Sequence, residues 1–236
     1  MFMSDFNKRL LQLPTILWGE VAAIDELKGR WIGGQSIHPY QLAQLKKSVL
    51  VTSTGASTRI EGSTLGDAEI ERLIRSAAAG KHASRNEQDV RGYFAVLSRV
   101  FESHDAIPFS ESTILTLHNE MLKFVEKDSS HRGKYKTTEN YVTAVADGKK
   151  VAVILQTTAP FLVRKEMESL IAWTKERLDF NDAHPLAVIG NFIAEFLKIH
   201  PFKDTVRFFG LVLRTSVYFA PLRVFLPFAA LLGLAG

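Results

Sequence analysis

The sequence contains no cysteine among its 236 residues. A disulfide framework, a thiolate zinc site, an iron–sulfur cluster and a thiol nucleophile are therefore excluded. The chain also lacks internal repeats and low-complexity linkers. Its first residues have neither the long apolar core nor the small-residue cleavage site of a signal peptide. These features predict a cytoplasmic protein with one large domain or two small ones.

An excess of charge of one sign is also missing from most of the chain. The formal net charge is +4, but residues 205–236 hold three arginines and no lysine or acidic residue. The preceding 204 residues carry 26 basic and 25 acidic side chains. The isoelectric point of 9.2 therefore depends mainly on a short C-terminal segment. A nucleic-acid partner is not implied.

Long hydrophobic runs are limited to the same C-terminal segment, in which 21 of 32 residues are hydrophobic. Its last uncharged run, Val224–Gly236, has only 13 residues. A membrane-spanning helix needs roughly 20. Membrane insertion is not favoured, although a membrane-associated helical protein that uses this segment is one alternative interpretation.

Helical periodicity dominates the rest of the sequence, with apolar residues recurring every three or four positions. Ser110 is expected to cap the N-terminus of a helix. The helix that ends at Ile199 is the most apolar and is predicted to be central and buried. We expect helices over residues 16–33, 39–57, 67–79, 85–103, 111–125, 164–178 and 184–199.

The pattern changes between residues 131 and 160. The β-branched run Val151–Leu155 and the dipeptide Asp147-Gly148 predict a β-hairpin with an Asp-Gly turn, within roughly Lys136–Thr158. The fold class is therefore all-α, with one small hairpin placed before the most buried helix.

Three segments together carry a family resemblance: Ser57-Thr-Arg-Ile-Glu-Gly62, His131-Arg-Gly-Lys-Tyr-Lys-Thr137 and Ile199-His-Pro-Phe-Lys-Asp204. In this order, around a hairpin and a buried helix, they resemble the Fic/Doc family of protein adenylyltransferases, in the class whose inhibitory helix precedes the Fic core. The resemblance implies an N-terminal helical region over residues 1–108 and a Fido domain over residues 109–236.

The resemblance also implies a chemistry. A histidine at the C-terminus of a helix, followed by a helix-stopping proline, projects into the next loop, where it can act as a general base. His200 would deprotonate a target hydroxyl that attacks the α-phosphate of ATP, and Asp204 would hold Mg²⁺. The family pattern assigns nucleotide contacts to Glu61, Pro201, Phe202, Lys203, Asp204 and Arg207.

Two further parts of the chain receive roles from the resemblance. The inhibitory motif is Ser57, Glu61 and Gly62, in which the glutamate blocks productive seating of the ATP γ-phosphate. The hairpin corresponds to the flap that binds the target, with Lys136, Thr137 and Asn140 at its entry. The expected partners are ATP and a protein with a Ser, Thr or Tyr hydroxyl, and a homodimer is allowed.

The sequence departs from the family after Asp204. It has Thr205-Val206 where the family has Gly-Asn-Gly, and Arg207 takes the motif arginine position only if one residue is deleted. A Thr-Val pair does not readily supply the positive φ that glycine allows. We expect residues 205–236 to be out-of-frame translation or the product of a damaged gene. A catalytically inactive remnant that binds nucleotide or a partner protein is the alternative to an autoinhibited enzyme.

Overall fold

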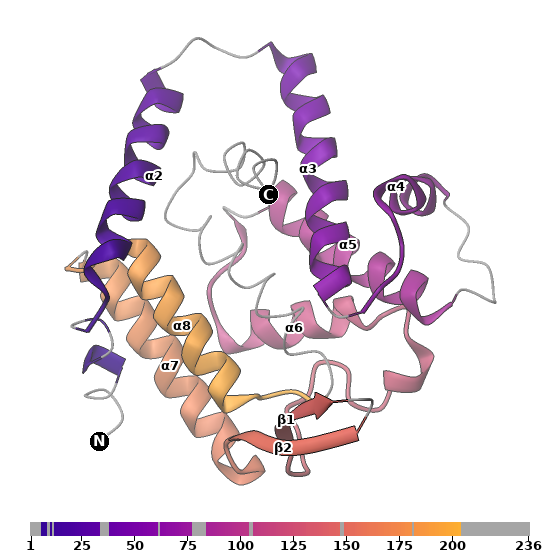
Figure 1. Cartoon of the computed structure of the whole chain (residues 1–236), viewed down its shortest axis with the longest axis vertical. Helices are drawn as coiled ribbons and strands as arrows, with labels where there is room; N and C mark the ends of the chain where they lie inside the picture. Colours follow the sequence, from indigo (N-terminus) through magenta and orange to yellow (C-terminus); the bar gives the residue numbers. More distant parts are fainter. Residues whose placement is uncertain are drawn as a thin grey trace.

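The computed structural model describes residues 6–8, 10, 12–33, 38–60, 62–76, 84–103, 106–146, 149–180 and 182–203. Long helices dominate this part of the chain, and one two-stranded hairpin lies beside them (Figure 1). The predicted all-α class with a small hairpin is therefore confirmed. The elements are α2 (Thr15–Gly33), α3 (Pro39–Ile60), α4 (Asp67–Arg75), α5 (Arg85–Ser103), α6 (Glu111–Met121), η2 (Glu126–Asp128), β1 (Tyr141–Ala146), β2 (Lys149–Gln156), α7 (Pro160–Phe180) and α8 (Pro185–Ile199).

The helix starts follow local chemistry. Ser110 caps α6, because its Oγ accepts a hydrogen bond of 3.2 Å from the backbone N–H of Thr113. Pro160 is the first residue of α7, where a missing N–H costs nothing, and the helix starts four residues earlier than predicted. Two helices also end earlier than predicted, α4 at Arg75 and α6 at Met121.

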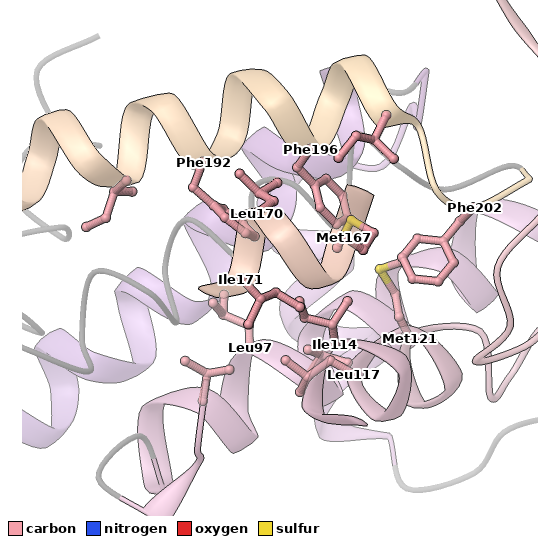
Figure 2. Close-up of a cluster of buried hydrophobic side chains, with 14 of the residues drawn as sticks. Leu97, Ile114, Leu117, Met121, Met167, Leu170, Ile171, Phe192, Phe196 and Phe202 are labelled. Carbon is pink, nitrogen blue, oxygen red and sulfur yellow. The ribbon is translucent and has the colours of Figure 1, made fainter. Parts of the chain in front are cut away.

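The core forms where α7 and α8 pack against each other and onto α5 and α6. Figure 2 shows Phe192 and Phe196 of α8 pointing toward Met167 and Leu170 of α7, above the α6 side chains. As predicted, α8 is buried along most of its surface. The residues that it exposes to solvent are Gly190, Ala194 and Lys198, a narrow stripe with a spacing of four residues.

Helices α5 and α6 approach each other unusually closely at Gly92. A Cβ atom built on this glycine would lie 1.8 Å from the carbonyl oxygen of Met121. No side chain fits in that space, so glycine is required where α5 crosses the end of α6.

Strands β1 and β2 pair antiparallel, from Tyr141 opposite Gln156 to Ala146 opposite Lys149. Two irregularities interrupt the register, between Val142 and Thr143 and between Ala144 and Val145. Figure 1 shows the hairpin beside the C-terminal end of α8. This arrangement brings the hairpin base to the residues that follow the buried helix.

Across the described ranges, no helix combines the length and the apolar character that crossing a membrane requires. The C-terminal segment on which the membrane alternative depends lies outside these ranges.

Candidate functional site

The candidate site begins where α8 ends. His200 is the C-cap of this helix, and its backbone N–H donates to the Phe196 carbonyl oxygen over 3.0 Å. Its backbone is left-handed, with φ 53° and ψ 59°. Within the described ranges, it is the one non-glycine residue with a positive φ. An L-residue other than glycine pays about 1–2 kcal/mol for this conformation, so neighbouring contacts must hold it.

The residues after His200 turn back into the core. Pro201 is buried, and Phe202 is fully buried with 0% exposure. The Phe202 ring stacks on the imidazole of His118 in α6, with ring centroids 3.7 Å apart. Lys203 is exposed. Phe202 belongs to the predicted nucleotide-binding segment, but its side chain packs in the core and anchors the loop there.

His118 connects this loop to the Arg132-Gly133-Lys134 segment. Its Nδ1 accepts a hydrogen bond of 3.0 Å from the backbone N–H of Gly133. Gly133 has a φ of +62°, and a Cβ there would lie 3.0 Å from the Leu115 carbonyl oxygen. Burial, together with the charge of nearby His131, lowers the pKa of His118 to about 3. The imidazole is therefore neutral and has a structural role.

A buried ammonium group lies at the base of the hairpin. The Lys136 Nζ donates to Asn140 Oδ1 over 2.6 Å, to Thr157 Oγ1 over 2.7 Å and to the Ile199 carbonyl oxygen over 3.3 Å. These bonds use all three donors of a lysine. Burial lowers the Lys136 pKa to about 8, an effect that the carboxylates of Glu166 and Glu139 partly offset.

Two further bonds tie the same segment to the loop after α8. The backbone N–H of Lys136 donates to the Pro201 carbonyl oxygen over 2.8 Å. The Asn140 Nδ2 donates to the Phe202 carbonyl oxygen over 3.1 Å. Lys136 is only 5% exposed, so its side chain is largely shielded from solvent. Thr137 is exposed.

A polar hollow opens at the hairpin base beside these bonds. The Asn140 and Thr157 side chains that meet the Lys136 ammonium also form part of its wall. The hollow is lined by Glu139, Asn140, Tyr141, Gln156, Thr157 and Ala159.

The segment predicted to be inhibitory ends α3. Ser57 is buried, and its Oγ donates to the Tyr93 hydroxyl of α5 over 2.8 Å. The backbone N–H groups of Gly62 and Ser63 donate to the carbonyl oxygens of Arg59 and Thr58, and Gly62 has a φ of +96°. This is the glycine-terminated Schellman motif of a helix end. Ser57 therefore anchors α3 on α5, and Gly62 ends the helix.

Three predicted site residues, Glu61, Asp204 and Arg207, lie outside the described residues. The inhibitory role that the resemblance implies for Glu61 therefore stays a prediction. Over the ranges that the structure covers, no group of three or more His, Asp or Glu side chains is arranged to hold a metal ion.

Sequence reasoning identified neither Thr157 nor the structural contacts of His118. Nothing local marks Thr157, because its partners Lys136 and Asn140 precede it by 21 and 17 residues. Gly133 lies 15 residues after His118, so no local pattern marks the bond between its backbone N–H and the imidazole.

Comparison with known proteins agrees with the fold. Residues 108–205, which contain α6, the hairpin, α7, α8 and the His200 loop, match the model of the Fic/DOC family. This part of the chain belongs to that family. The sequence matches no curated protein.

Solved structures with a Fic domain have the same fold. The chain is similar to a Fic domain containing signaling protein from Bacteroides thetaiotaomicron, with 22% identity, a TM-score of 0.69 and coverage of 83% of this chain and 72% of that one. It is similar to a Fic family protein from Desulfovibrio desulfuricans, with 23% identity and a TM-score of 0.70, covering 94% of this chain and 63% of that one. Fic-1 from C. elegans matches with 17% identity, a TM-score of 0.65 and coverage of 94% and 71%.

Proposed function

We propose that this chain is a Fic-type protein adenylyltransferase in which the phosphate-binding loop is impaired. The observation that carries the proposal is the position of His200. It follows a buried helix, is held in a left-handed turn, and lies in a Fic-family segment next to a hairpin with a polar hollow at its base. A general base needs this kind of rigid support.

In the proposed reaction, His200 takes the proton of a Ser, Thr or Tyr hydroxyl of the target. The new bond joins that oxygen to the α-phosphorus of ATP, and the bond to the leaving pyrophosphate breaks. Asp204 is the residue proposed to hold Mg²⁺, because a carboxylate with phosphate oxygens and water is the ligand set that this ion prefers. The bound ion would supply neutralisation of phosphate charge.

Incubation of the purified chain with labelled ATP and Mg²⁺ tests the proposal. Label on protein that disappears in His200→Ala but persists in Lys198→Ala supports it. Lys198 is a suitable control because it lies exposed on the same helix. Label that persists in His200→Ala would contradict the assignment of His200 as the base.

We expect transfer by the unaltered chain to be weak or absent, even after Glu61→Gly. Removing this carboxylate relieves a block on phosphate seating, but it supplies no backbone donor in place of Gly-Asn-Gly. The loss of one such donor typically lowers the rate by about 10²–10³. Replacing Thr205-Val206 with Gly-Asn-Gly and adding a family-like following helix should restore transfer. Robust transfer without these changes would overturn this expectation.

The alternative is a remnant that binds nucleotide without transferring it. A calorimetric titration with ATP and Mg²⁺ separates the two functions when it is combined with the labelling experiment. Binding without label favours the remnant, whereas binding with His200-dependent label favours the enzyme.

A further inference from the structure

We infer that the Lys136 side chain positions His200, by locking the loop after α8 to the base of the hairpin. The significance of His200 as a base rests on the proposed function, whereas the mechanical coupling does not. The inference starts from the left-handed backbone of His200, which is unfavourable for a β-carbon-bearing residue and persists only where its surroundings determine it.

The carbonyl groups on both sides of His200 are held from one short segment. Ile199, immediately before it, accepts from the Lys136 Nζ, and Pro201, immediately after it, accepts from the Lys136 backbone N–H. A single residue therefore binds the carbonyl groups of the residues immediately before and after His200. Phe202, one residue further along, accepts from Asn140.

The same ammonium also fixes the hairpin base. Asn140 directly precedes β1, Thr157 directly follows β2, and both side chains accept from the Lys136 Nζ. The Thr157 hydroxyl in turn donates to the Asn140 carbonyl oxygen over 2.7 Å. Both ends of the hairpin and the turn at His200 thus meet at one cation. A movement of the hairpin is transmitted to His200 through these bonds.

The test is a nuclear magnetic resonance comparison of the full chain with Lys136→Met, Lys136→Arg and Lys134→Met. Global stability is a poor measure, because Lys136→Met removes the desolvation cost of a buried charge together with its bonds. The Cα and Cβ shifts of His200 report its backbone conformation, and amide exchange reports local opening. Lys134→Met is the matched control, since Lys134 is an exposed lysine two residues away.

In Lys136→Met we expect the His200 shifts to leave the left-handed range. Exchange should rise by about tenfold at His200, at Phe202 and in both strands, as the loss of one or two hydrogen bonds would give. Lys136→Arg should restore most of the protection, because it keeps a buried cation with several donors. Lys134→Met and the amides of α5 should not change.

Unchanged His200 shifts in a folded Lys136→Met protein would overturn the inference, as would a uniform rise in exchange over all helices. If Lys136→Met does not fold, Thr157→Val provides the same test, because it removes one partner of the ammonium and keeps the side-chain shape. It should raise exchange at Phe202 and in β2, and no rise there would also refute the coupling. None of these measurements needs ATP. Failure to bind nucleotide would therefore contradict the proposed function alone, and the chemical shifts would still test the coupling.

Discussion

His118 shows how burial fixes the protonation state of a single residue. Its Nδ1 accepts from the Gly133 backbone N–H and its ring stacks on Phe202, so a proton on Nδ1 would remove the acceptor that Gly133 requires. The folded protein keeps the imidazole neutral down to a pH of about 3, the value to which burial lowers its pKa. The stability of the loop that contains Phe202 therefore depends on pH.

We predict that the free energy of unfolding decreases as the pH falls from about 6.5 toward 3. In that range the unfolded chain binds a proton at His118, whereas the folded chain does not. Between pH 7.5 and 5 this single group should remove about 2 kcal/mol. Urea unfolding at pH 7.5, 6 and 5 measures the effect.

His118→Asn keeps an oxygen close to the Nδ1 position and does not titrate. Its free energy of unfolding should therefore fall less steeply with decreasing pH, because unfolding no longer takes up a proton at this position. Equal slopes for wild type and His118→Asn would show that this imidazole titrates normally in the fold.

At the scale of elements, the helices α5 and α6 depend on one glycine. The space at Gly92 is closed by the backbone of α6, which cannot move away without shifting the whole helix. Gly190 of α8 is also in mid-helix, but a Cβ there would meet nothing within 4 Å. The two positions therefore form a matched pair.

We predict opposite effects of the same substitution at these glycines. Gly92→Ala should destabilise the protein by about 2–4 kcal/mol, because the helices must separate to admit the methyl group. Gly190→Ala should stabilise it by about 0.5–1 kcal/mol through helix propensity. Thermal or urea unfolding monitored by circular dichroism compares them. A stabilising Gly92→Ala would show that α5 and α6 are not in close contact.

Most elements were predictable from sequence because their information is local. The apolar spacing and the Ser110 cap identify α6, and the β-branched run and the Asp-Gly dipeptide identify the hairpin. The end of α6 was predicted too late because Leu122 and Val125 continue the apolar spacing, and both are buried although they lie beyond the helix. The helix ends at Met121, but Leu122 and Val125 are still buried, so their apolar character does not reveal where the helix stops.

The candidate site was predictable only in part, for the same reason. The His-Pro-Phe segment is contiguous and is recognisable from its residues. The bond between Lys136 and the Ile199 carbonyl joins residues 63 positions apart, and no periodicity encodes it. A lysine among polar residues has the composition of a solvated turn, whereas Lys136 forms a buried cross-link in the structure.

At the scale of the whole molecule, the loop after α8 is part of the core. Phe202 contacts the rings of His118 in α6, Tyr135 before the hairpin and Phe196 in α8. Figure 2 shows its ring beside Met121, on the side of the cluster where α8 ends. The loop that carries the proposed base therefore shares side chains with the packing that holds the helices together.

We predict that Phe202→Ala lowers the free energy of unfolding by about 3–5 kcal/mol, the cost of a large cavity in a core. Phe161→Ala should change it by less than about 0.5 kcal/mol, because Phe161 is 83% exposed on α7. Chemical denaturation of the two variants is the measurement. A Phe202→Ala protein as stable as wild type would mean that the loop is detached from the core in solution.

The cross-link between residue 136 and residue 199 has a consequence for the order of folding. During synthesis α5, α6 and the hairpin leave the ribosome before α8, so the Lys136 ammonium has at first no Ile199 carbonyl to bind and stays hydrated. A contact between distant parts of a chain forms slowly, because closing the intervening loop lowers the entropy of the chain. The left-handed turn at His200 is therefore expected among the last features to form. A chain arrested before α8 docks would have its helices but not the geometry of the site.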